Sequence, residues 1–183
     1  YIVSAVGTGA KYGGIAISET LISGVSEGIE NPSTYTFSDN SFSHILCTRS
    51  PWNSNHYVNV INKGGSKFRA TLYDLNGTTY SELKTYDYSL IREKDNFGAS
   101  LYYDDVFHED EYLQFIYNNS TTASSYDTLS GTTKYNLVGG SRGEEPTDSD
   151  ITEAWSLFQS ANKYPVNIFM DVYGNHAGDI NNL

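Results

Sequence analysis

The chain has 183 residues, of which 14% are aromatic and only 18% are charged. So many aromatic residues argue against a disordered chain, and so little charge argues against a coiled coil or long solvated helices. The formal net charge of −11 makes nucleic acid and anionic membranes unfavourable partners. The sequence shows no apolar run long enough to span a membrane and no recognisable secretory signal, and its single cysteine, Cys47, excludes an intrachain disulfide.

The first fifty residues are rich in Gly and Ser and have weak periodicity. A short strand is predicted over residues 15–17, and the Asn31-Pro32 pair breaks any regular element that follows. We therefore expect residues 1–50 to pack on, or to be inserted near, a main domain formed by residues 51–183.

The clearest strand pattern lies in the middle of the chain. Apolar and polar residues alternate over 56–61 and again over 67–75. Asn76-Gly77 follows, a pair typical of tight hairpin turns because both residues tolerate positive φ. The sequence thus predicts a β-hairpin with a returning strand over 78–86.

Residues 101–150 hold ten acidic and two basic residues, so the negative charge is concentrated there. Two short strands, over 100–103 and 112–117, are predicted on either side of an acidic tract at 104–111. A further strand over 134–138 ends at Gly139-Gly140.

One long helix is predicted, over 148–161, because acidic residues suit its N-terminus and four apolar residues form one stripe. These four are Ile151, Ala154, Trp155 and Phe158. A strand over 166–172 follows Pro165. The expected fold class is α+β and β-rich, with layered β-sheets, a β-hairpin and a strand–helix–strand unit near the C-terminus.

Gly24-Val25-Ser26-Glu27-Gly28 fits the G-x-S-x-G pattern of hydrolase nucleophile elbows, which need a strand before the serine and a helix after it. Asn31-Pro32 leaves no room for that helix, and partners for Ser26 would have to come from as far away as Asp171 and His176. We interpret Ser26 as a loop residue.

Two other segments suggest ligands only weakly. The glycine-rich residues 7–14 lack the Gly-Lys-Ser/Thr ending of a phosphate-binding loop. The acidic tract at 104–111 holds five acids and His108, but it lacks the EF-hand spacing, and His108 has no second histidine four residues on. We interpret the tract as a solvated connection and leave open whether it binds a cation.

The remaining histidines, His44, His56 and His176, share no spacing and are interpreted as packing or surface residues. Trp52 and Trp155, with the many tyrosines, would suit a sugar-binding surface, although Trp155 lies on the apolar stripe of the predicted helix. We assign no catalytic, cofactor-binding or metal-binding residue, and we expect a structural or binding protein rather than an enzyme.

A succession of motifs runs from the hairpin onward. In chain order they are KFRATLYD at 67–74 with Asn76-Gly77, SLYYDDV at 100–106, the strand at 112–117, YNLVGG at 135–140, EAWSLF at 153–158 and VNIFM at 166–170. This order resembles that of the contractile tail sheath proteins of bacteriophages.

The resemblance implies a structural virion protein that needs no cofactor. Sheath subunits assemble as stacked rings around a tail tube, and on a signal from the baseplate they slide into a shorter, wider array that drives the tube through the host envelope. The implied partners are neighbouring sheath subunits, with the tube and baseplate reached through other regions. The implied location is the virion, and the host cytoplasm during assembly.

The chain ends at Leu183, before the segments that form the inner, tube-facing domain of this family. The resemblance therefore implies a protruding part of a longer subunit, which by itself stays monomeric. Two alternatives remain open: a β-rich carbohydrate-binding module, and a serine hydrolase built around Ser26.

Overall fold

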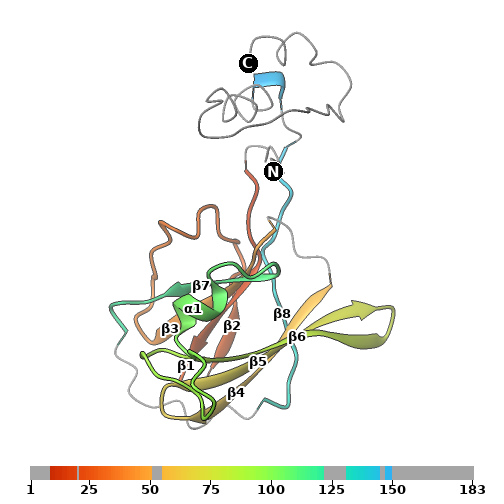
Figure 1. Ribbon diagram of the computed structural model, residues 1–183. Helices are drawn as coiled ribbons and strands as arrows, with labels where there is room; N and C mark the ends of the chain where they lie inside the picture. Colours follow the sequence, from red (N-terminus) through yellow and green to blue (C-terminus); the bar gives the residue numbers. More distant parts are fainter. Residues whose placement is uncertain (1–8, 20, 51–54, 122–130, 145–146, 150–183) are drawn as a thin grey trace, which may run out of the picture. The chain divides into compact units, whose positions relative to one another are not determined.

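The computed structural model describes residues 9–19, 21–50, 55–121, 131–144 and 147–149 (Figure 1). The chain divides into two compact units, Lys11–Ser141 and a second unit formed by Tyr1–Ala10 together with Arg142–Leu183. Every strand and helix given below belongs to the first unit. Of the predicted helix over 148–161, Asp148 and Ser149 have helical backbone; the rest of it, and the strand predicted over 166–172, lie outside the described residues.

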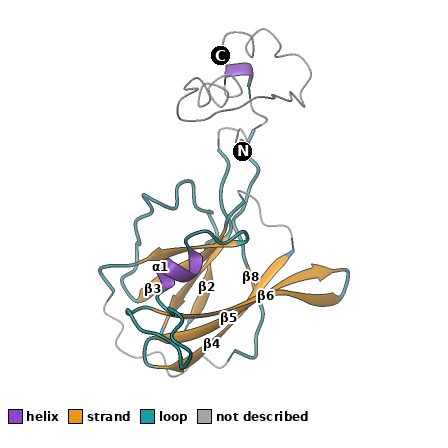
Figure 2. Cartoon of the chain, viewed as in Figure 1, coloured by secondary structure: helices purple, strands orange, loops and turns teal. Residues whose placement is uncertain are grey.

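The first unit is built from two antiparallel sheets of four strands each (Figure 2). The first sheet has the order β2-β1-β3-β7, and its strands are β1 (Gly14–Ser18), β2 (Ile22–Gly24), β3 (Phe42–Thr48) and β7 (Leu113–Tyr117). The second has the order β6-β5-β4-β8, and its strands are β4 (His56–Gly64), β5 (Lys67–Asn76), β6 (Thr79–Ser89) and β8 (Tyr135–Asn136). The predicted β-rich fold with layered sheets is confirmed.

The main core lies between the two sheets. Along β5, Phe68, Ala70 and Leu72 are buried while their neighbours in the strand are half-exposed, as the alternation in the sequence predicts. Ile15 and Ile17 of β1 belong to the same core cluster and come from the other sheet. The two sheets thus pack against each other through apolar faces, and the second sheet keeps its other face half-exposed.

Strand β1 is buried along its whole length, because the first sheet is covered on both faces. A second, smaller core contains Ala16, Ile45 and Ile29, with Tyr35 and Phe37 packed against it from the segment between β2 and β3. Continuous burial explains why the sequence shows little periodicity in this part of the chain. The compact unit runs across residue 50 and takes three strands of its first sheet from the N-terminal part of the sequence.

The predicted hairpin is confirmed as β5–β6, but its turn lies one residue later than expected. Asn76 pairs with Thr79, so the two loop residues are Gly77 and Thr78. Gly77 has φ +63°, and Asn76 does not have positive φ. Glycine at the first loop position is the arrangement of a type II′ turn. The end of this hairpin projects beyond the rest of its sheet (Figure 2).

The strand predicted over 100–103 is wrong. Residues 100 and 102 form only isolated bridges. Tyr103 begins the short helix α1 (Tyr103–Phe107), the only helix among the described residues of the first unit. Asp104 and Asp105 lie in its first turn, where carboxylates interact favourably with the free N–H groups of a helix.

The two ends of the first unit lie side by side. The N–H of Lys11 donates to the carbonyl of Ser141 at 2.8 Å, and the N–H of Ser141 donates back to the carbonyl of Lys11 at 2.9 Å. The chain therefore enters and leaves this unit at one place. Within the described part of the chain, no helix has the length and apolar character needed to cross a bilayer.

Candidate functional site

The sequence predicts that the acidic tract at 104–111 is a solvated connection, but only part of it is exposed to solvent. Asp104, Asp105, Glu109 and Glu111 are exposed, but the side chain of Asp110 is only 1% exposed. Asp110 lies in the tight connection between α1 and β7, where the chain reverses over the edge of the core. One residue of the tract is therefore part of the fold, and the others form an acidic surface.

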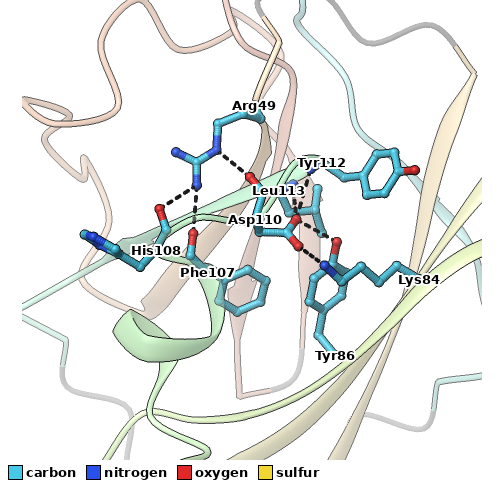
Figure 3. Close-up of polar contacts among 8 residues, drawn as sticks. All are labelled: Arg49, Lys84, Tyr86, Phe107, His108, Asp110, Tyr112 and Leu113. Carbon is cyan, nitrogen blue, oxygen red and sulfur yellow. Dashed lines mark hydrogen bonds and ion pairs between the residues drawn. The ribbon is translucent and has the colours of Figure 1, made fainter. Parts of the chain in front are cut away.

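Four groups bind the Asp110 carboxylate, and a fifth binds its backbone carbonyl (Figure 3). One carboxylate oxygen accepts hydrogen bonds from the hydroxyl of Tyr86 at 2.8 Å and from the N–H groups of Tyr112 and Leu113 at 3.0 and 2.8 Å. The other pairs with the ammonium of Lys84. Because Lys84 and Tyr86 lie on β6, this carboxylate ties the second sheet to the start of β7 in the first.

The fifth group is the Arg49 guanidinium, which holds the backbone of the same connection. It donates to the carbonyls of Phe107, His108 and Asp110 at 2.7, 3.2 and 3.0 Å. Two of these carbonyls lie at the C-terminal end of α1, where no further helical turn follows to donate N–H groups to them. Arg49 follows β3 directly, so it locks α1 onto the first sheet.

Burial alone raises the pKa of the Asp110 carboxyl, but the hydrogen bonds from Leu113, Lys84, Tyr86 and Tyr112 outweigh it and leave the pKa below its usual value. The carboxylate is ionised and already accepts from four donors, three on one oxygen and the Lys84 ammonium on the other. Among the described residues, no cluster of three or more His, Cys, Asp or Glu side chains is arranged to hold a metal ion.

Ser26 lies in an exposed turn after β2, and no helix follows it. It borders a cavity of about 290 Å³ that also contains Asp39, whose carboxylate accepts the N–H of Ser41 at 2.8 Å. The described lining of this cavity includes no histidine. The proposed distant partners Asp171 and His176 lie outside the described residues. The local geometry is that of a loop, without the strand–turn–helix of a nucleophile elbow.

His44 is completely buried between the sheets. Its Nδ1 lies 2.7 Å from the Ser43 hydroxyl, and its Nε2 lies 2.9 Å from the Tyr88 hydroxyl. Ser43 donates its own proton to the carbonyl of Ile17 at 3.1 Å, so Nδ1 of His44 carries the ring proton and Nε2 accepts from Tyr88. Burial lowers the pKa of His44 to about 3. This histidine is a neutral core residue.

The remaining candidates divide as follows. Burial raises the pKa of the Cys47 thiol to about 12, which makes this buried sulfur a poor nucleophile. His56 begins β4, whereas Trp52, Trp155 and His176 lie outside the described residues.

A tyrosine cluster lies on the outer face of the second sheet. The Tyr57 and Tyr73 rings pack edge-on against Tyr80, with centroids 5.2 and 6.3 Å apart. The ammonium of Lys134 lies 4.8 Å from the Tyr73 centroid and 5.1 Å from that of Tyr80. Because the Tyr80 ring stands nearly perpendicular to the other two, the three rings do not form one flat platform of the kind that stacks on a sugar.

A second cavity, beside α1, measures about 200 Å³ and includes Arg49, Asp104 and His108 in its lining. The Arg49 guanidinium is committed to backbone carbonyls on one side of it. This cavity belongs to the Arg49–Asp110 corner and adds no separate group of reactive side chains.

A third cavity has a volume of about 420 Å³, and no pattern in the sequence predicted it. We call it the cationic cavity. Its charged lining comprises Lys63, Lys67, Arg69 and Lys94 with Asp87 and Asp95, and Phe97 lies at its rim. The cations come from the ends of β4 and β5 and from the loop after β6, three segments that the fold brings together. A count of charges at strand ends would have drawn attention to Lys63 and Lys67, but no local pattern places Lys94 beside them.

Comparison with known protein families and with curated proteins finds no match for this chain.

Proposed function

We propose that this protein is a structural component of a contractile phage tail, a protruding part of the sheath subunit. The subunit would polymerise around the tail tube and contract to drive the tube through the host cell envelope. The observation that carries the proposal is the order of motifs between residues 67 and 170, which resembles that of tail sheath proteins.

The paired ends of the Lys11–Ser141 unit support the proposal. A compact unit that is entered and left through two adjacent hydrogen-bonded segments is suited to insertion in a longer chain, since its host needs only two neighbouring attachment points. This kind of attachment suits a protruding domain of an assembled subunit.

The use of buried polar groups also supports a mechanical role. Asp110 joins β6 to β7, and His44 with Tyr88 joins β3 to β6, so both ionisable contacts cross between the two sheets. Satisfied buried networks make a core rigid. A rigid unit suits an array that changes its packing between two states while each subunit keeps its own fold.

Electron microscopy of the protein expressed from its complete gene tests the proposal. We expect tubular polymers with a central channel. The control is the same protein with residues 11–141 replaced by a short linker, which the adjacent ends of that unit permit; it should still form tubes, because the proposal places assembly in other regions. A complete protein that stays monomeric in all conditions would contradict the sheath role and favour the carbohydrate-binding alternative.

A further inference from the structure

The cationic cavity contrasts with the rest of this acidic chain. Four cations and two carboxylates line it, whereas the chain as a whole has a net charge of −11. The local excess of positive charge therefore attracts acidic groups to a place on a protein that otherwise repels them.

The charges in the cavity are not all neutralised. Lys67 pairs with Glu93 at 2.9 Å, and Arg69 pairs with Asp87 at 2.6 Å. Lys63 and Lys94 are exposed, and within the described part of the chain neither ammonium lies within 4.0 Å of a carboxylate, although Lys63 interacts electrostatically with Asp87, which already pairs with Arg69. Two cations are thus available to an incoming carboxylate.

An ordered loop presents a large apolar side chain at the rim. Phe97 is 96% exposed, yet its loop is well fixed. One carboxylate oxygen of Asp95 accepts the N–H groups of Phe97 and Ala99 at 2.9 and 2.8 Å, and Gly98 turns the chain with φ +88°. The backbone that carries Phe97 is therefore held before binding, and a partner that covers the exposed ring would remove a large apolar surface from water.

We propose that the cationic cavity and Phe97 form a contact surface for the acidic tract at 104–111 of a neighbouring copy of this chain. The inference rests on the proposed function, which supplies neighbouring copies. The exposed carboxylates of that tract are Asp104, Asp105, Glu109 and Glu111. They complement Lys63 and Lys94, and Val106, which is half-buried within the tract, offers apolar surface to Phe97.

Each copy presents both halves of this contact, a cavity and a tract. When two different surfaces of one chain bind each other, copies link head to tail and form rings or helical arrays. One such contact buries too little surface to hold a dimer at micromolar concentration, but many identical contacts in an array reinforce one another.

Zero-length cross-linking tests the contact directly. Isotope-labelled and unlabelled copies of the 183-residue chain are mixed at about 1 mM, where a millimolar Kd gives partial occupancy, and treated with a carbodiimide that joins lysines to carboxylates in contact. We expect mixed-isotope cross-links between Lys63 or Lys94 and carboxylates of 104–111. They should disappear at about 1 M salt, where the Debye length falls to about 3 Å.

Variants separate this contact from general charge attraction. Lys67 lines the same cavity and is retained as the reporter lysine. The double variant Lys63→Glu, Lys94→Glu should lower the yield of mixed-isotope cross-links between Lys67 and carboxylates of 104–111 about tenfold, equivalent to about 1.4 kcal/mol. Its control, Lys11→Glu with Lys134→Glu, has the same net charge and should leave the yield unchanged. Phe97→Ser should also lower the yield, whereas Leu21→Ser, at another exposed apolar residue, should not.

A charge exchange gives the strictest test. Mixing the Lys63→Glu, Lys94→Glu chain with an Asp104→Lys, Glu109→Lys chain should restore cross-linking between the exchanged positions. Cross-links spread evenly over all surface carboxylates, or equal losses in the control variants, would overturn the proposal. Tighter binding of polyglutamate than of a second copy would also overturn it, by showing that the cavity takes an unrelated acidic partner.

The same variants in the complete protein keep the two proposals distinct. Normal tubes in which these cross-links are absent would refute the contact and leave the sheath role standing. Cross-links between copies of a complete protein that never forms tubes would support the contact and contradict the sheath role.

Discussion

At the scale of single residues, the most informative side chains are polar ones in the core. Asp110 and His44 are buried polar residues that would destabilise the fold if they lacked hydrogen-bond partners. Asp110 accepts from Tyr86 of β6 and Leu113 of β7, and His44 bonds to the adjacent Ser43 and to Tyr88 of β6. Hydrogen bonds of this kind fix which strands face each other more narrowly than apolar contacts do. The acidic character of 104–111 was evident from the sequence, but nothing in the order of its residues distinguishes the buried Asp110 from the exposed Glu109 and Glu111.

Asp110→Ala should destabilise the protein by about 3–5 kcal/mol, because it leaves the Tyr86 hydroxyl and two backbone N–H groups without an acceptor. Asp110→Asn keeps one carbonyl oxygen in place, and Lys84 is exposed enough to be solvated, so we expect a loss of about 1–2 kcal/mol. Denaturant unfolding measures both. Glu109→Ala is the matched control in the same tract and should have little effect; an equally small effect of Asp110→Ala would show that its contacts do not support the fold.

His44 should make stability depend on pH in a defined window. The unfolded chain binds a proton at His44 below its ordinary pKa of 6.5, whereas the folded chain does so only near pH 3. Between these values the unfolded state holds more protons, so the free energy of unfolding should fall with decreasing pH by up to about 1.4 kcal/mol per unit. The full stability is present above pH 6.5.

The groups that face His44 are Ser43, Tyr88, Phe68 and Phe115, none of which ionises in this window. His44→Gln should therefore flatten the dependence of the free energy of unfolding on pH above about pH 4. The control His108→Gln, which removes an exposed imidazole, should leave the slope of the wild-type profile unchanged. A His44→Gln profile as steep as that of the wild type would assign the pH dependence to other groups.

At the scale of elements, how well the sequence predicts a strand depends on whether one or both faces of that strand are buried. Strands β4 and β5 have one buried and one half-exposed face, and the alternation of their sequences located them correctly. Strand β3 contains the buried polar residues Ser43 and His44, and every residue after Phe42 is buried, so alternation gives no signal there. Helix α1 has only five residues, too few for a helical period to show against the tyrosines that suggest a strand.

Gly77 should be the residue on which the β5–β6 turn depends. It has φ +63°, and a Cβ added there would meet no other atom within 4 Å, so the effect of Gly77→Ala is purely conformational. We expect a loss of about 1–2 kcal/mol, with faster hydrogen exchange in β5 and β6. Gly77→Asn should cost less because asparagine tolerates this conformation. Thr78→Ala, in the same turn without positive φ, should be nearly neutral; equal effects of all three changes would contradict the type II′ turn.

At the scale of the whole molecule, the fold brings together what the sequence keeps apart. Lys11 and Ser141 are neighbours although 129 residues separate them, and the cationic cavity takes its lysines from the ends of β4 and β5 and from the loop after β6. Long-range pairing of this kind depends on strand order, which local patterns do not specify. The composition predicted a β-rich fold, but neither the closure of the first unit nor the cationic cavity was visible before the strands were in place.

The 183-residue chain should be monomeric at micromolar concentration. Its contact surface for a neighbouring copy, as proposed above, is small, and interfaces well below about 1,000 Å² rarely hold dimers in that range. The net charge of −11 adds repulsion between free copies, most strongly at low salt. Sedimentation should therefore give one species near 20.3 kDa. The proposed sheath role further predicts that the protein from the complete gene sediments as large polymers. A stable micromolar dimer that survives Lys63→Glu with Lys94→Glu would reveal a different and larger interface, and tubes formed by the 183-residue chain alone would place assembly within it rather than in other regions of the subunit.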